Sequence, residues 1–337
     1  REQLAASEAG DAAPDARTDV GPPGTPNART SREPTEKRPP GGSSRSRLLD
    51  RIRGDRAQGS ANSPGSRDLP GTGPLAEVAG LSLRRGEVTA LHDVDISLRA
   101  GETVALMGRN GAGKSSLLNS LVGVHVPTAG TVSVGTDRLV PSRTRPGRLL
   151  RHVGLVPQEP RDLLYADTVA AECASADADS GAADGTCRDL VGTLLPGVAG
   201  GTHPRDLSEG QRLALALAVV LTARPPVVLL DEPTRGLDYA AKSRLVGILN
   251  ALREEGHAIV LATHDVELAA ESAQRVVILA QGEIVADGPT AEVVTSSPAF
   301  APQVSKVLAP ARWLTVPQVR GALSASRDAS GREGAAE

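Results

Sequence analysis

Aromatic and sulfur-containing side chains are scarce in this chain of 337 residues, which has one Phe, one Trp, two Tyr, two Cys and one Met. The two cysteines, Cys173 and Cys187, lack the spacing of a metal site, so we predict neither a disulfide framework nor a zinc site. No apolar run approaches the roughly 18 residues needed to span a bilayer. The sequence also shows no signal-peptide pattern. We therefore expect a cytoplasmic chain without a membrane span.

Lysine is also rare, since the chain has four, at positions 37, 114, 242 and 306. Almost all of the positive charge is arginine, and the formal net charge is -3. This balance argues against a protein that coats nucleic acid, and we expect no nucleic-acid partner. Lys114 lies in a glycine-rich stretch, where the compact ammonium of lysine could not be replaced by the larger planar guanidinium of arginine.

That stretch, residues 108–115, fits the pattern G-x-x-x-x-G-K-[ST] of a phosphate-binding loop. The motif requires a strand before it and a helix after it, and the apolar run 103–107 and residues 116–122 predict these elements. The glycines let successive N–H groups face phosphate oxygens at a helix N-terminus. A chance glycine-rich turn is the alternative, but the strand, lysine and hydroxyl together favour the loop. We predict these nucleotide-binding residues: Gly108, Arg109, Asn110, Gly111, Ala112, Gly113, Lys114, Ser115 and Ser116.

A second apolar run, residues 227–230, predicts a buried strand that ends at Asp231 and Glu232. In nucleotide hydrolysis Lys114 would reach the β- and γ-phosphates, while Ser115 and Asp231 would hold Mg²⁺. Glu232 would polarise the attacking water. A paired carboxylate could instead cap a helix, but a phosphate loop needs an acidic partner of this kind.

Strands alternate with helices along the rest of the chain, which predicts an α/β fold with a parallel sheet. Ligands of such sheets bind at the carboxyl ends of the strands, where Gly108, Asp231 and His264 all fall. Residues 160–205 are locally helical, with a polar interruption at 175–186, and a hairpin is expected about residues 281–282. Residues 1–74 are rich in Pro, Gly, Ser and charge, and are predicted to be a disordered arm or linker.

Residues 207–211, Leu-Ser-Glu-Gly-Gln, resemble the signature motif of ATP-binding-cassette (ABC) ATPases. The phosphate loop, Gln158, the Asp231–Glu232 pair, residues 236–238 and His264 follow that family's order, over about residues 75–289. The resemblance implies a P-loop NTPase of ABC type, with a mixed sheet and flanking helices, an antiparallel β subdomain and an inserted α-helical subdomain at about 160–223. It sets an ATPase domain at 75–297 and a C-terminal extension at 298–337. The extension is expected to form helical turns broken by prolines, with its last 12 or so residues disordered.

The resemblance also implies a role for each matching residue in an ATPase that uses ATP and Mg²⁺. Two domains would pair head to tail, and Ser208, Gly210 and Gln211 would contact the nucleotide of the opposite domain. Asp238 would contact the facing domain. The expected catalytic residues are Glu232, His264, Lys114 and Gln158, and the expected metal ligands are Ser115, Gln158 and Asp231.

The chain departs from the family where an aromatic residue usually stacks on adenine. Residues 83–87 contain none, and Arg85, whose guanidinium can stack on a planar ring, is the nearest substitute. The base selectivity therefore stays open, whereas the phosphate chemistry does not depend on this position.

Residues 160–169 and the tail 300–316 are similar to the ATPases of energy-coupling-factor importers of vitamins and metal ions. This narrower resemblance implies integral membrane partners and a peripheral position on the cytoplasmic face of the membrane. The long arm and the Arg at position 1 fit the second cassette of a fused actinobacterial protein with two cassettes. The C-terminal extension is either a packing tail or a contact for a partner.

Two other functions are compatible with a phosphate loop. A soluble ABC protein acting on ribosomes or DNA usually carries two cassettes with a basic connecting helix, zinc-binding cysteines or a coiled coil, and none of these features is visible. A small-molecule kinase does not explain residues 207–211. The sequence leaves open the transported substrate and whether the second ATPase domain is a copy of this chain, a different chain or part of a longer one.

Overall fold

The protein is described here by a computed structural model that covers residues 73–296, 301–308 and 313–333, with side chains up to residue 324. Almost all of the expected arm, residues 1–74, lies outside the described residues, so its disorder remains a prediction. Within the described residues, no helix is both long and apolar enough to cross a membrane.

The centre of the fold is a six-stranded sheet with the strand order β5-β6-β7-β3-β8-β9. Its strands are β3 (Thr103–Met107), β5 (Val153–Val156), β6 (Val227–Asp231), β7 (Ala258–Ala262), β8 (Arg275–Ala280) and β9 (Glu283–Pro289). The first five strands of this order pair in parallel, and β9 pairs antiparallel with β8 through the hairpin expected about residues 281–282. The predicted mixed α/β sheet is therefore confirmed.

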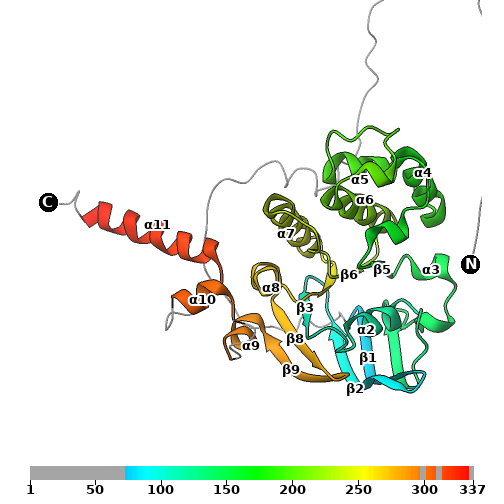
Figure 1. Ribbon diagram of the computed structural model, residues 1–337, viewed down its shortest axis with the longest axis horizontal. Helices are drawn as coiled ribbons and strands as arrows, with labels where there is room; N and C mark the ends of the chain where they lie inside the picture. Colours follow the sequence, from blue (N-terminus) through cyan, green and yellow to red (C-terminus); the bar gives the residue numbers. More distant parts are fainter. Residues whose placement is uncertain (1–72, 297–300, 309–312, 334–337) are drawn as a thin grey trace, which may run out of the picture. The chain divides into compact units, whose positions relative to one another are not determined.

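A second sheet of three antiparallel strands has the order β2-β1-β4. It is formed by β1 (Ala76–Arg85), β2 (Val88–Leu98) and β4 (Ala129–Val134), and Figure 1 shows it beside α2 (Lys114–Leu121). The antiparallel β subdomain of the predicted fold is confirmed in this sheet.

Alternate residues of the parallel strands enter different hydrophobic clusters, because successive side chains of a strand point to opposite faces. Val227 and Leu229 of β6 pack with the three-stranded sheet and α2. Val228 and Leu230 pack with helices on the other face, and Ile259 and Leu261 of β7 join the same cluster. Both faces are covered, which explains why these strands are continuous apolar runs.

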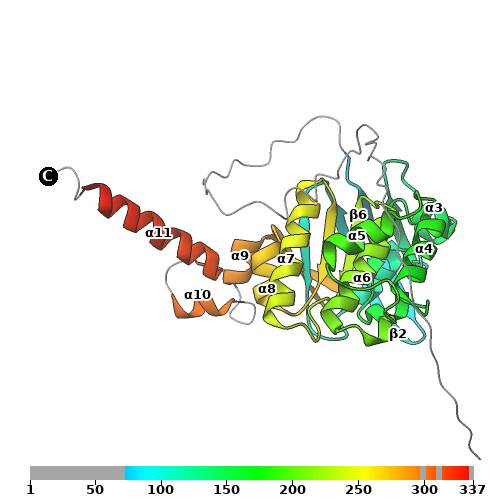
Figure 2. The ribbon, with the colours of Figure 1, turned by 90° about the horizontal axis from the view of Figure 1, so that it is seen from above.

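The helices on that other face come mainly from the predicted helical subdomain. They are α4 (Val169–Ser180), α5 (Thr186–Leu194), α6 (Glu209–Thr222) and α7 (Tyr239–Glu254). Figure 2 shows α5, α6 and α7 on the same side of the strands. The short elements between β4 and α6 are η1 (Pro141–Arg143), α3 (Pro146–Leu149), η2 (Pro160–Leu163) and η3 (Pro204–Asp206).

The interruption expected at residues 175–186 begins later than predicted. The helix α4 continues to Ser180, and the break is confined to residues 181–185. Asp177, a polar residue that suggested a loop, is buried inside the helix. Its carboxylate accepts the N–H groups of Gly185 at 2.7 Å and Cys187 at 2.8 Å. Asp177 thus caps the next helix, a role that depends on the fold and not on its local sequence.

The C-terminal extension contains α10 (Gln303–Val307) and α11 (Val316–Glu333), which follow α8 (Val266–Ser272) and α9 (Thr290–Ser296). The expectation that the last 12 or so residues are disordered is wrong up to Glu333, because α11 continues to that residue. After Pro317 near its start, α11 contains no further proline to stop it. Residues 334–337 lie outside the described residues.

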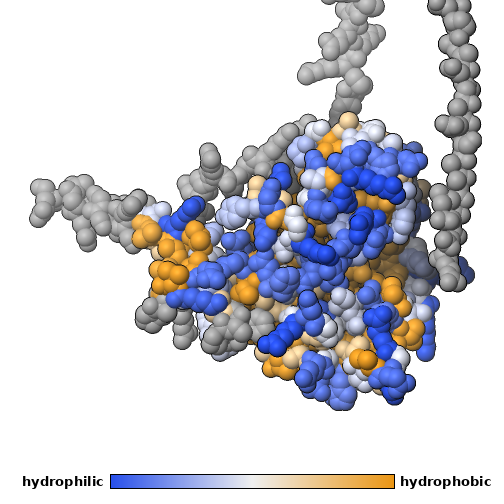
Figure 3. All heavy atoms as spheres, viewed as in Figure 1, coloured by the Kyte–Doolittle hydropathy of each residue, from blue (hydrophilic) through white to orange (hydrophobic). Residues whose placement is uncertain are grey.

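Part of this extension packs on the cassette, since Leu314 is buried with side chains of β8 and α9. Val307, Leu308, Val316 and Leu323 remain exposed. Figure 3 shows hydrophobic surface over α10 and the start of α11. The extension therefore packs in part on the cassette, and its exposed apolar side chains are available for contact with a partner.

We predict that Asp177→Ala lowers the free energy of unfolding by about 1–3 kcal/mol, because the N–H groups of Gly185 and Cys187, the latter buried, lose their carboxylate acceptor. Urea unfolding followed by circular dichroism measures the change. Asp179→Ala, an exposed position of the same helix, is the control and should stay within about 0.5 kcal/mol of the parent chain. Equal losses in the two variants would contradict the capping role.

Candidate nucleotide-binding site

The phosphate loop connects β3 to α2, as its sequence predicts. Gly113 has φ 110°, and a Cβ on it would lie 2.7 Å from the Ala90 carbonyl oxygen. Gly108 has φ 150°, and a Cβ there would lie 2.3 Å from the Leu279 carbonyl oxygen. Glycine is therefore required at both positions, by backbone conformation and by space. No side chain caps the first turn of α2, so this helix end is suited to an anion.

Lys114 is buried and points back along the loop. Its Nζ donates to the Gly108 carbonyl oxygen at 2.9 Å. The same Nζ lies 3.4 Å from Oε1 of Glu232. The loop lysine and the carboxylate after β6 therefore face each other in one buried site.

Asp231 and Glu232 carry buried oxygens with unused hydrogen-bonding capacity. Oδ1 of Asp231 and Oε1 of Glu232 have no hydrogen-bond partner among the described residues. Burial raises the pKa of Asp231, while a hydrogen bond from the Ser115 hydroxyl opposes the shift. An orphaned carboxylate oxygen beside a hydroxyl is the kind of hard oxygen set that divalent cations such as Mg²⁺ prefer.

The backbone of Glu232 is strained, because this non-glycine residue has φ 48°. Its N–H group donates to the Ala262 carbonyl at 2.8 Å, which fixes the turn against the end of β7. Its Oε2 lies 2.6 Å from Nδ1 of His264, whose side chain is 72% exposed. One oxygen of Glu232 thus faces the lysine and the other faces a histidine at the site's mouth.

These groups share a cavity of about 1,090 Å³. The predicted site residues that line it are Asn110, Gly111, Gly113, Lys114, Ser115, Ser116, Gln158, Asp231, Glu232 and His264. The other loop residues, Gly108, Arg109 and Ala112, do not line it, and neither do Ser208, Gly210, Gln211 and Asp238.

Several lining residues escaped prediction as site residues: Val88, Thr89, Ala90, Arg235, Gln281 and Gly282. The last two belong to the β8–β9 turn, which no local signal connects to the loop. Gly282 donates to Ala112 at 3.1 Å and accepts from His92 at 2.9 Å, so the turn is joined to both the loop and β2. Arg85, the predicted substitute for an aromatic residue, does line the cavity.

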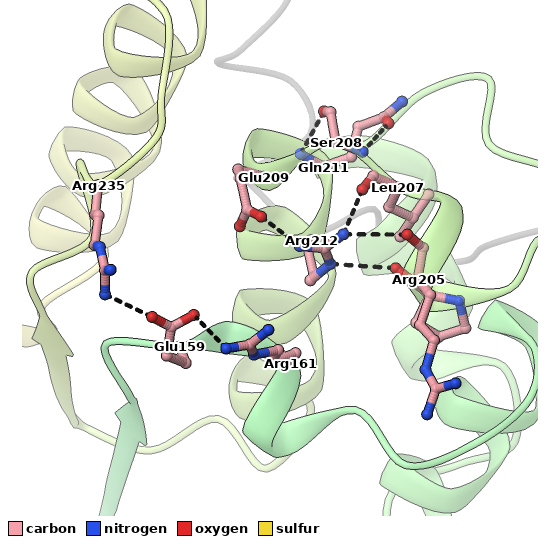
Figure 4. Close-up of polar contacts among 10 residues, drawn as sticks. Glu159, Arg161, Arg205, Leu207, Ser208, Glu209, Gln211, Arg212 and Arg235 are labelled. Carbon is pink, nitrogen blue, oxygen red and sulfur yellow. Dashed lines mark hydrogen bonds and ion pairs between the residues drawn. The ribbon is translucent and has the colours of Figure 1, made fainter. Parts of the chain in front are cut away.

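The signature residues are used for local structure in this chain. The Ser208 hydroxyl accepts the N–H of Gln211, whose side chain accepts the N–H of Ser208, and this reciprocal pair caps α6 (Figure 4). The pattern Ser-x-x-Gln is a readable signal for such a cap. Asp238 similarly caps α7 by accepting the N–H of Ala241 at 2.7 Å.

The signature turn is further held by Arg212, which donates to the carbonyls of Pro204, Arg205 and Leu207 and pairs with Glu209 (Figure 4). The turn lies against residues 236–238, since a Cβ on Gly236 would lie 3.2 Å from Glu209. The fold therefore presents two separate assemblies, a cavity at the loop 108–116 and a hydrogen-bonded turn at residues 207–211.

Comparisons with known proteins agree with this arrangement. The ABC transporter family profile matches residues 91–235. A protein of Streptomyces avermitilis named "Putative ABC transporter ATP-binding protein" is 72% identical over 251 residues, which cover 74% of this chain and 44% of that protein. The chain thus spans less than half the length of this relative.

Two shorter proteins match over most of their own length. The cobalt import ATP-binding protein CbiO of Rhodobacter capsulatus is 38% identical over 216 residues, 62% of this chain and 76% of that protein. A dimeric post-hydrolysis structure of the ATP-binding cassette MJ0796, bound to ADP and Pi, aligns at 26% identity with a TM-score of 0.55, over 64% of this chain and 98% of that one. The chain belongs to the family of ABC transporter ATP-binding proteins.

Proposed function

We propose that this chain is the ATP-binding and ATP-hydrolysing motor of an ABC transporter, of the energy-coupling-factor type that imports a vitamin or a metal ion. The observation that supports the motor chemistry most strongly is the contact set of Glu232, with Lys114 on one carboxylate oxygen and His264 on the other. The import direction is supported by the likeness to a cobalt import ATP-binding protein.

ATP would bind with its phosphates in the loop at residues 108–116. Lys114 would then exchange the Gly108 carbonyl for β- and γ-phosphate oxygens. Glu232, held at the cavity by the strained turn, would accept a proton from the water that attacks the γ-phosphate. His264 would orient that water and the γ-phosphate from the exposed mouth of the cavity.

Ser115, Gln158 and Asp231 would hold Mg²⁺ beside the phosphates. Among the described residues, no cluster of three or more His, Cys, Asp or Glu side chains could hold a metal ion by itself. Mg²⁺ needs no such cluster, because proteins commonly bind it through one or two carboxylates together with other oxygens and the substrate phosphates. When bound, the ion neutralises negative charge on the β- and γ-phosphates.

The signature residues 207–211 lie outside the nucleotide cavity of their own chain, and this separation supports a head-to-tail dimer. Ser208 and Gly210 begin a capped helix but do not line the cavity of their own chain. The positive end of α6 would be used against the γ-phosphate of a facing cassette. Asp238, at the neighbouring turn, would lie at the same interface. The facing cassette is a copy of this chain, a different chain or part of a longer one.

A second cavity of about 590 Å³ is our candidate for the contact with a membrane partner. It is lined by residues of the segments 161–167 and 203–205 and by Arg212. Tyr165 there is 84% exposed, as expected of an aromatic anchor that awaits a partner. A membrane subunit seated in this cavity would place the chain at the cytoplasmic face of the membrane as a peripheral protein.

We predict that Glu232→Gln lowers the ATP hydrolysis rate by roughly 10²–10⁴-fold, because the water loses its proton acceptor. ATP binding should persist, since Lys114 and the loop are unchanged. Lys114→Ala should instead lose nucleotide binding. Phosphate release and equilibrium binding of labelled ATP, measured on both variants, separate the two effects. Equal hydrolysis by Glu232→Gln and the parent chain would refute this assignment.

We predict that Asp231→Asn stabilises the nucleotide-free chain. Burial raises the pKa of Asp231 in the folded state, so the folded chain binds this proton more tightly than the unfolded chain does. The free energy of unfolding therefore falls as the pH rises from the ordinary carboxyl pKa through the raised pKa. At neutral pH, asparagine should raise Tm by roughly 2–4 °C, the shift that about 1 kcal/mol gives in a domain of this size.

The same variant should lose the extra Tm shift that Mg²⁺ adds to ATP in the parent chain. Thermal unfolding with ATP, with and without Mg²⁺, measures both effects. Asp179→Asn, at an exposed position, is the control and should change neither. A lower Tm for nucleotide-free Asp231→Asn would contradict the account.

We predict that Ser208→Asp prevents ATP-driven dimerisation of the Glu232→Gln chain, whereas Ser208→Asn permits it. Both side chains preserve the cap of α6, but only aspartate places a negative charge against the γ-phosphate of the facing site. Light scattering with ATP and Mg²⁺ gives the dimer fraction. Equal dimerisation by the two variants would argue against a role of this turn in the facing site.

A further inference from the structure

The only two cysteines of the chain, Cys173 and Cys187, meet in one buried hydrophobic cluster. Cys173 belongs to α4 and Cys187 to α5, and their side chains are 2% and 0% exposed. The two helices pack together and lie beside each other in Figure 1. Both thiols are free in this structure. Their spacing in the sequence predicts no disulfide framework, yet the fold makes them neighbours.

Asp177 holds the two cysteines close together. It follows Cys173 by about one turn of α4, so both side chains lie on the same face of that helix. Its Oδ1 accepts the N–H of Cys187 at 2.8 Å. A hydrogen bond also joins the two thiols directly. The pair is therefore assembled by the fold itself.

A metal ion does not match this pair. Among the residues that the structure describes, no group of three or more His, Cys, Asp or Glu side chains could hold one. The carboxylates of α4 are engaged elsewhere, since Asp177 accepts the N–H groups of Gly185 and Cys187. Glu172 likewise accepts the N–H of Ala166 at 2.8 Å. Two neighbouring thiols without further ligands are suited to oxidation to a disulfide.

The two thiols differ in acidity. The hydrogen bond from Cys173 lowers the pKa of Cys187, although burial opposes this shift. The same hydrogen bond raises the pKa of Cys173, and burial adds to that shift. Cys187 therefore ionises more readily, while Cys173 keeps its proton. This is the division between an attacking cysteine and the resolving cysteine beside it.

The position of Cys187 gives a small oxidant a route to its thiol. This residue lies in the first turn of α5, directly after the connection 181–185, whose residues are mostly exposed. Local opening of an exposed connection requires much less free energy than global unfolding. A peroxide could therefore reach Cys187 while the sheet stays folded.

We propose that Cys173 and Cys187 form a reversible disulfide when the chain meets a hydroperoxide, so that the attachment of α4 to α5 depends on the redox state. The Cys187 thiolate attacks one oxygen of hydrogen peroxide and the O–O bond breaks, which leaves a sulfenic acid and a hydroxide. That hydroxide takes up the proton that Cys187 released on ionising. The Cys173 sulfur then attacks the Cys187 sulfur, the S–O bond breaks, and the second hydroxide leaves as water with the Cys173 proton. The two sulfurs lose two electrons, and the peroxide becomes two waters.

Oxidation of the reduced full chain by a small excess of hydrogen peroxide tests the proposal. The intact mass should fall by two hydrogen atoms, and protease digestion should yield fragments joined through Cys173 and Cys187. Dithiothreitol should reverse both changes by thiol–disulfide exchange. Because the bridge closes a loop of about 15 residues, Tm should rise by about 5–10 °C.

Cys173→Ala is the matched control, because it keeps the attacking thiol and removes its partner. Under the same peroxide it should gain oxygen at Cys187 and show no rise in Tm. Circular dichroism of the reduced variant checks that it folds, and alanine suits a site where cysteine acts as a small apolar side chain. Oxidation of Met107, the one methionine of the chain, would occur in the parent chain and the variant alike.

Thiols that react only after unfolding in urea would overturn the proposal, and so would a bridge that forms between two chains. A bridge within the chain that lowers Tm would also contradict it, because the folded state would then not accommodate the bond. An equal rise of Tm in the parent chain and Cys173→Ala would assign the effect to another oxidation. If the variant does not fold, the mapped bridge and the Tm of the parent chain decide the question.

Discussion

The arrangement of the site depends on a buried imbalance of charge. Two carboxylates, Asp231 and Glu232, lie beside one ammonium, Lys114. Oε1 of Glu232 is 3.4 Å from that ammonium, whereas Oδ1 of Asp231 has no hydrogen-bond partner among the described residues. An unsatisfied buried oxygen destabilises a folded chain, so the one on Asp231 favours a ligand that satisfies it. A triphosphate carrying Mg²⁺ would do so, since its cation would lie against Asp231 and its phosphates against Lys114 and the loop.

The architecture supplies the rigidity that this imbalance requires. The strands β6, β7 and β3 are buried on both faces and end side by side, so the groups that follow them are held at one edge of the sheet. The strained turn at Glu232 is fixed by its bond to Ala262. The more exposed parts of the site, His264 and the pair of Glu159 with Arg235, lie where movement costs least. Buried residues thus form the floor of the site, and exposed residues lie at its mouth.

Much of this site could be predicted because its signals are local. The apolar runs of β3 and β6, followed directly by the glycine-rich loop and the acidic pair, identify both halves of the phosphate site. Asp177 shows where local reasoning fails: a polar residue that suggested a loop is buried and caps the next helix through the backbone. Gln281 and Gly282 enter the cavity only because a hairpin closes over the phosphate loop, and no periodicity records that contact. The capping pair Ser208 and Gln211, by contrast, follows a readable pattern.

The structure of the chain with ATP and Mg²⁺ bound tests the central claim most directly, through the position of the Lys114 ammonium. Here its Nζ donates to the Gly108 carbonyl at 2.9 Å. The account predicts that Nζ leaves this carbonyl and contacts β- and γ-phosphate oxygens, while the ion lies against Ser115 and Asp231. A triphosphate bound elsewhere, or one in the cavity with Lys114 still on Gly108, would contradict it.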